Sequence, residues 1–138
     1  IDRMVGGVDI LSERAEMKVL IIEDSGVMRR IHANTLREHG IAAADMMEAE
    51  DGAVALELAE RNNVDLFLVD WNMPKLDGLA LVKKLRGMPE YEETPIIMVT
   101  SEAAKYHVVE AIKAGVTNYV VKPVRGDTLW QKIGKYFA

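Results

Sequence analysis

From Lys18 onward, hydrophobic residues form two kinds of pattern that alternate along the chain. Short continuous apolar runs, such as VLII and LFLV, are typical of strands buried on both faces of a parallel sheet. Longer stretches with apolar residues at intervals of three and four indicate amphipathic helices. We predict strands over residues 18–23, 45–50, 64–70, 95–100 and 117–121. We predict helices over residues 26–40, 51–63, 77–87, 102–115 and 126–137.

The helical patterns also predict which side chains face the core. In the first helix, the expected buried face consists of Met28, Ile31, Thr35 and Leu36. In the fourth helix, it consists of Val108, Val109 and Ile112. Asp127 or Thr128 is the expected N-cap of the last helix, because both side chains accept hydrogen bonds from backbone N–H groups.

Five strands that alternate with five helices predict a doubly wound α/β fold, in which helices cover both faces of a parallel sheet. Ligands of such folds bind beyond the carboxyl ends of the strands. The residues at those ends are therefore the first place to look for chemistry.

The composition narrows the range of partners. A chain of 138 residues fits one domain with one sizeable core. The net charge of -5 argues against binding nucleic acid through phosphate contacts. No apolar stretch approaches the ~20 residues that span a bilayer, so we expect no membrane insertion. Cysteine is absent, which excludes disulfides and thiolate metal sites and fits a cytoplasmic location.

Residues 1–16 differ from the rest of the chain. They contain the pair Gly6-Gly7, mixed charges and no sustained periodicity. Met17 then opens the sequence MKVLIIEDS, which resembles a natural start. We therefore expect residues 1–16 to be an extension, either native or vector-derived, and residues 17–138 to form the folded domain.

Polar residues gather at the predicted strand ends, namely Glu23, Asp24, Asp70, Thr100 and Lys122. Two carboxylates ~4 Å apart repel by about 4 kcal/mol at an effective dielectric constant of about 20, and a bound cation removes this repulsion. Carboxylate oxygens without cysteine or histidine nearby suit Mg²⁺. A metal beside an aspartate suits phosphoryl transfer, with Asp70 as nucleophile. Thr100 and Lys122 supply a hydroxyl and a positive charge for the phosphoryl oxygens.

Other classes of site fit these residues less well. A dinucleotide-binding site needs a glycine-rich turn after the first strand, where this chain has EDSG. An EF-hand needs glycine at the sixth loop position, and Gly78 comes too late in DWNMPKLDG. A phosphohydrolase that forms an aspartyl phosphate is the serious alternative, although Asn72 stands where its proton-donating acid is expected. Turnover of a phosphomonoester would identify that class.

The motifs IIEDS, LVDWNMPKLDG, IIMVTS and NYVVKP follow one another at four of the predicted strand ends. Together they resemble the receiver domain of response regulators, and most of all the single-domain chemotaxis regulators of the CheY type. The resemblance covers residues 18–138 and implies a flavodoxin-like strand order, 2-1-3-4-5. It also implies a two-component signalling pathway, in which a histidine kinase or a phosphotransfer protein phosphorylates Asp70.

The resemblance implies a metal site around this phosphoacceptor. Asp24 and Asp70 would hold Mg²⁺ directly, together with the backbone carbonyl of Asn72. Glu23 would contribute through a water molecule. Glu23 replaces the commoner aspartate, which lengthens the side chain and keeps its charge.

The resemblance also implies roles in phosphoryl binding and switching. Thr100 and Lys122 would contact the phosphoryl group, and the peptide bond between Lys122 and Pro123 would be cis. Tyr119 resembles an aromatic switch residue, which turns inward when Thr100 is drawn to the phosphate. Asn72 and Glu102 would tune self-dephosphorylation, because they lie beside the path of the attacking water.

The expected activity is that of a signalling protein with self-phosphorylation and self-dephosphorylation, rather than that of an enzyme with a separate substrate. A downstream target would bind the face formed by residues 102–115, 117–121 and 126–137. Val124 stands where phenylalanine often follows Lys-Pro, so this surface is expected to recognise a different partner. We expect a monomer, and a receiver domain that is part of a larger regulator stays an alternative.

Overall fold

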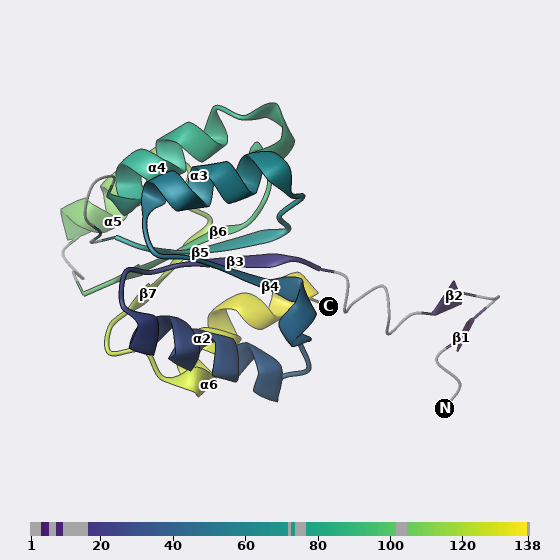
Figure 1. Ribbon diagram of the computed structural model, residues 1–138. Helices are drawn as coiled ribbons and strands as arrows, with labels where there is room; N and C mark the ends of the chain where they lie inside the picture. The colour runs from purple at the N-terminus through teal and green to yellow at the C-terminus, as the bar shows by residue number, and fades with distance from the viewer. Residues whose placement is uncertain are drawn as a thin grey trace.

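The computed structural model describes residues 4–5, 8–9, 17–71, 73, 77–101 and 105–137 (Figure 1). The strands of the main sheet are β3 (Val19–Ile22), β4 (Met46–Ala49), β5 (Leu66–Asp70), β6 (Ile96–Thr100) and β7 (Asn118–Val121). The α-helices are α2 (Gly26–Glu38), α3 (Gly52–Arg61), α4 (Gly78–Arg86), α5 (Lys105–Ala114) and α6 (Gly126–Ile133). Short 3-10 helices, which the sequence pattern did not predict, occupy Ala43–Asp45, Pro89–Tyr91 and Gly134–Phe137. Near the N-terminus, β1 (Met4–Val5) pairs with β2 (Val8–Asp9) in antiparallel fashion.

The main sheet is parallel, and its strand order is β4-β3-β5-β6-β7. This is the order 2-1-3-4-5, so the predicted fold class is confirmed. Every residue of β3, β5 and β6 is buried. This explains why the sequences of these strands are continuous apolar runs and do not alternate between apolar and polar residues.

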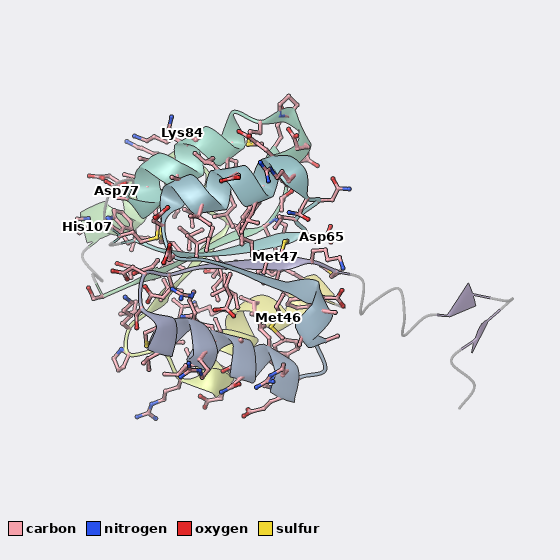
Figure 2. All side chains as sticks on the ribbon, viewed as in Figure 1. Met46, Met47, Asp65, Asp77, Lys84 and His107 are labelled. Carbon is pink, nitrogen blue, oxygen red and sulfur yellow. The ribbon has the colours of Figure 1, made fainter. Side chains whose placement is uncertain are left out.

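Helices cover both faces of the sheet (Figure 1). Helices α2 and α6 lie on one side, called here the α2/α6 face, and α3, α4 and α5 lie on the other. Successive strand residues point to opposite faces, so each strand contributes to two separate cores. Met46 and Met47 show this alternation, because they point to opposite sides of the sheet and pack against different cores (Figure 2).

The structure corrects the predicted buried faces of two helices. In α2, Ile31 is 40% exposed and His32 takes the buried position, with 2% exposure. In α5, Val109 and Ile112 are exposed, whereas Ala111 is buried. Both errors have the same cause, since the prediction counted large apolar residues and the packing selected the face that meets the sheet.

Side chains cap several helices at the end nearest the carboxyl ends of the strands. Ser25 Oγ accepts a hydrogen bond from Met28 N at 3.2 Å, and Asp77 Oδ1 accepts one from Ala80 N at 2.8 Å. The predicted cap of α6 is wrong, because Arg125 is the N-cap residue and makes no capping hydrogen bond with its side chain. Packing of the fully buried Leu129 and Ile133 holds α6 instead. None of the helices in the described ranges combines the length and the apolarity that a transmembrane segment needs.

Candidate functional site

The carboxyl ends of four strands bring polar residues to one edge of the sheet. Asp70 is the last residue of β5, and Thr100 is the last residue of β6. Glu23 directly follows β3, and Lys122 directly follows β7. Because β3 pairs with β5, and β6 pairs with both β5 and β7, these positions lie along one edge.

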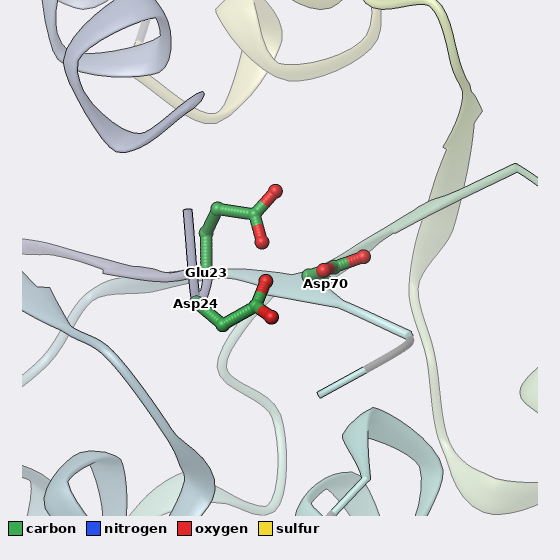
Figure 3. Close-up of side chains that lie close together, drawn as sticks. All are labelled: Glu23, Asp24 and Asp70. Atoms are coloured by element: carbon green, nitrogen blue, oxygen red, sulfur yellow. The ribbon is translucent and has the colours of Figure 1, made fainter. Parts of the chain in front are cut away.

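Three carboxylates form the centre of this edge. Glu23, Asp24 and Asp70 each offer an oxygen atom, and these atoms lie within 4.8 Å of one another. Figure 3 shows their side chains directed toward a shared space. Glu23 is 2% exposed and Asp70 is 3% exposed, whereas Asp24 is open to solvent. The group is therefore accessible from one side and is walled by protein on the other.

Lys122 partly neutralises this negative charge. Its Nζ lies 3.0 Å from Asp70 Oδ1 and 3.7 Å from Glu23 Oε1. Burial by itself lowers the pKa of Lys122, but the contact with Asp70 and the charges of all three acids outweigh burial and raise it. Lys122 is therefore a permanent positive charge beside Asp70.

One lysine does not balance three acids. The pKa of Glu23 is raised to about 8, mainly by burial and further by the nearby Asp70 and Asp24 carboxyls, while Lys122 acts in the opposite direction. Without a cation, Glu23 therefore holds a proton near neutral pH. Like charges in a poorly solvated space produce this behaviour.

The strand alternation divides the site between the two faces of the sheet. Asp70 comes two residues after Leu68, and Lys122 comes two residues after Val120. Residues two apart in a strand point to the same face, and the side chains of Leu68 and Val120 belong to the core on the α2/α6 face. Thr100 follows the alternation of Met98, which belongs to the core on the opposite face, and Tyr119 packs against that same core. Thr100 and Tyr119 therefore share a face, and Asp70 and Lys122 occupy the other.

Close backbone packing fixes the position of Asp70. Gly78 N donates a hydrogen bond to Trp71 O at 2.9 Å, at the point where α4 begins. A Cβ atom at Gly78 would lie 2.3 Å from Asp70 O, so only glycine allows this approach. Arg29 holds the other side of the site, because its Nη1 donates to Glu23 O at 2.6 Å.

The chemistry of these residues fits a hard divalent cation. Asp70 Oδ1 is buried, and within the described part of the chain it accepts no hydrogen bond of normal geometry, although Lys122 lies close to it. An incompletely satisfied carboxylate oxygen beside two further carboxylates is the donor set that Mg²⁺ prefers. Glu23, Asp24 and Asp70 are the residues that would hold it.

The comparison with protein families agrees with this site. A family model described as the response regulator receiver domain matches residues 19–134. The chain belongs to this family. The receiver domain is also similar to chemotaxis proteins along most of its length. It is 48% identical over 118 residues to the chemotaxis protein CheY homolog of Campylobacter jejuni, which covers 85% of this chain and 89% of the relative.

Another relative and a solved structure are also chemotaxis proteins. The chemotaxis protein CheY1 of Helicobacter pylori is 46% identical over 118 residues, which covers 85% of this chain and 94% of that protein. Among solved structures, the chemotaxis response regulator CheY4 of Vibrio cholerae superposes with a TM-score of 0.81 at 32% identity, and the match covers 87% of this chain and 98% of that one. This receiver domain is thus a phosphoacceptor signalling domain of the CheY type.

The structure of the receiver domain places most of the predicted site residues. It brings Glu23, Asp24 and Asp70 together and sets Lys122 beside them. The peptide bond between Lys122 and Pro123 is cis, as the family resemblance implies. Asn72 and Glu102 lie outside the described residues.

Sequence reasoning missed His32, a polar residue in the core beneath the receiver site. It is 2% exposed, and its Nδ1 has no hydrogen-bond partner within the described ranges. Its pKa is lowered to about 4, mainly by burial and further by the charge of Lys122, while the charge of Asp70 acts in the opposite direction. The sequence does contain a signal for the burial of His32, because it lies four positions after Met28 and four before Leu36 on one helical face.

Proposed function

We propose that Asp70 is the phosphoacceptor and that a histidine kinase or a phosphotransfer protein supplies the phosphoryl group. The observation that carries this proposal is a buried aspartate with two carboxylates and a lysine around it. An Asp70 oxygen attacks phosphorus, the bond from phosphorus to the donor histidine nitrogen breaks, and an acyl phosphate results. The ammonium of Lys122 stabilises the negative oxygens during this transfer.

Mg²⁺ is the proposed cofactor. Asp24 and Asp70 would hold it, with Glu23 acting through water and Asn72 providing its backbone carbonyl as in the family. When bound, Mg²⁺ neutralises the oxygens of the transferring phosphoryl group. The incompletely satisfied Asp70 oxygen and the raised pKa of Glu23 support a cation at this place.

Phosphorylation is proposed to change the face formed by α5, β7 and α6. The phosphoryl group adds roughly -1.5 to -2 charge at neutral pH. Thr100 moves toward it, and Tyr119, on the same face of the sheet, turns into the vacated space. The exposed Val109 and Ile112 on α5 support this face as the docking site of a downstream target, because they offer apolar contact area. The similarity to chemotaxis proteins favours a target in that type of pathway.

The lifetime of the acyl phosphate belongs to the same proposal. Water attacks phosphorus opposite Asp70, and Asn72 and Glu102 are polar residues that leave its path open. We expect fast self-dephosphorylation of a monomeric, cytoplasmic protein, and slower decay after Asn72→Arg or Glu102→Leu.

Intact-protein mass spectrometry after treatment with acetyl phosphate tests the central claim. We expect a single phosphoryl adduct in the presence of Mg²⁺, no adduct in EDTA, and no adduct on Asp70→Asn. Asp77→Asn is the matched control, since Asp77 is an exposed cap of α4 at the same edge of the sheet (Figure 2). This control should be phosphorylated like the wild type.

Two results would contradict the proposal. An adduct that survives Asp70→Asn would place the phosphoryl group elsewhere. Continuous release of phosphate from a phosphomonoester would instead favour the aspartyl-phosphate phosphohydrolase.

A further inference from the structure

Lys132 and Tyr119 form a contact across the edge of the sheet. Lys132 Nζ lies 5.4 Å from the centroid of the Tyr119 ring, a distance typical of a cation–π interaction. Both residues are half-buried, so solvent screens this contact only in part. An ammonium group above an aromatic ring favours the ring orientation that keeps the two together.

The topology gives this contact its significance. Strand β7 is an edge strand, and α6 packs on the α2/α6 face, whereas Tyr119 packs against the core on the opposite face. A side chain from α6 reaches the Tyr119 ring only by passing around the open edge of β7. The contact therefore holds the ring near that edge, whereas Thr100 lies one strand further into the sheet.

We propose that Lys132 is a positioning residue that holds the ring of Tyr119 at the edge of β7 and opposes its inward turn. This inference rests on the proposed function, because it assumes that Tyr119 turns inward when Asp70 is phosphorylated. The inward turn carries the ring away from the ammonium group, so the contact is lost on activation. Loss of a cation–π contact between partly exposed groups changes an equilibrium constant by about threefold.

The chain offers a matched control for this contact. Lys135 Nζ lies 5.3 Å from the centroid of the Tyr136 ring, in the turn that follows α6. Lys135→Met therefore removes the same charge and a similar contact close to the same place, without touching Tyr119. Lys132→Met keeps an unbranched side chain one atom shorter and removes its charge, and Lys132→Arg keeps a cation.

The experiment follows the fluorine NMR signal of Tyr119 in protein labelled with fluorotyrosine, as beryllofluoride is added with saturating Mg²⁺. Tyr119→Phe identifies the signal. We expect Lys132→Met to reach half of the full change at about threefold less beryllofluoride than the wild type. Lys132→Arg and Lys135→Met should both follow the wild-type curve.

The possible outcomes separate this inference from the proposed function. If the wild-type signal moves and Lys132→Met has the wild-type midpoint, the inference is wrong and the proposed switch stands. An equal shift of the beryllofluoride midpoint in Lys135→Met would also overturn the inference, because loss of any positive charge in this region would then explain the effect. If beryllofluoride leaves the wild-type Tyr119 signal unchanged, the proposed switch fails and the inference fails with it.

Discussion

At the amino end of the sheet, the Arg86 side chain donates hydrogen bonds to the carbonyl oxygens of Gly115, Tyr91 and Thr94, at 2.9, 2.6 and 2.7 Å. At the carboxyl end, Asp70 Oδ1 is buried without a hydrogen bond from the described residues, and three acids share one lysine. Figure 2 marks the two ends, with Asp65 near the first and Asp77 near the second. We call the amino end saturated, because its polar groups have hydrogen-bond partners, and the carboxyl end unsaturated, because its acids lack part of theirs. The same strands connect the two ends.

The difference shows where stability and function reside in this domain. Buried polar groups stabilise a fold when each has its partners, and they destabilise it when they do not. Tyr91 belongs to the saturated end, since its hydroxyl lies 2.5 Å from Ala59 O and 2.6 Å from Asn62 O. At the carboxyl end, Lys122 neutralises the three acids only in part, which leaves their oxygens available to a cation.

The largest expected effect is at the saturated end. Arg86→Ala should lower the free energy of unfolding by about 4 kcal/mol, because it removes several charge-assisted hydrogen bonds and leaves three carbonyls without this donor. Urea denaturation measures the change. Lys84→Ala, an exposed change on the same helix, should stay within about 0.5 kcal/mol of the wild type.

Because the two ends of the sheet have separate hydrogen-bond networks, we expect Arg86→Ala to leave phosphorylation of the folded protein unchanged. The folded fraction of the variant should accept phosphate from acetyl phosphate at the wild-type rate, since Arg86 bonds only at the amino end of the sheet. A loss of phosphorylation in fully folded protein would show that the two ends are not independent. A stability loss below about 1 kcal/mol would show that the network is weak.

The sequence predicts the two ends unequally well. Strand positions and the carboxyl-end residues followed from local patterns, because a parallel sheet brings all strand ends of one kind to one edge. Arg86 could not be recognised, since its acceptors are backbone carbonyls, which any sequence supplies, and one of them, Gly115 O, lies 29 residues further along the chain. His32 was missed because an apolar count passes over a polar residue, even when its spacing places it on the buried face.

The next largest effect concerns His32. The unfolded chain takes up a proton on this residue near pH 6.5, whereas the folded domain does so only near pH 4. Stability should therefore fall as the pH is lowered from about 6.5 to about 4, and His32 should have no such effect above that range. The difference between these two pKa values of His32 corresponds to roughly 3 kcal/mol of folding stability.

Urea denaturation at the two ends of this pH range measures the contribution of His32. His32→Val should lose less stability on acidification than the wild type does, and the difference between the two losses removes any cost of the smaller side chain. His39→Gln changes an exposed histidine at the end of α2 and should retain the wild-type loss. Equal losses in His32→Val and the wild type would contradict the prediction.

The smallest effect tests the unsatisfied charge itself. The carboxyl of Glu23 has an ordinary pKa of 4.5 and a pKa of about 8 in the folded domain. Between these values the folded state binds more protons than the unfolded state, so stability falls as the pH rises from about 4.5 to about 8. Glu23→Gln places a neutral side chain of the same shape at this position and removes the penalty.

In EDTA at pH 8, Glu23→Gln should therefore be more stable than the wild type by roughly 2 kcal/mol, less than the full pKa difference implies, because water and side-chain relaxation screen the buried charge. Near pH 5 the two proteins should differ little. Saturating Mg²⁺ should stabilise the wild type more than the variant if it binds as proposed, since the three acids come together only in the folded domain. Glu60→Gln, an exposed change on α3, should follow the wild type throughout. If Glu23→Gln has wild-type stability at both pH values in EDTA, the carboxyl end carries no electrostatic penalty, and the contrast between the two ends of the sheet disappears.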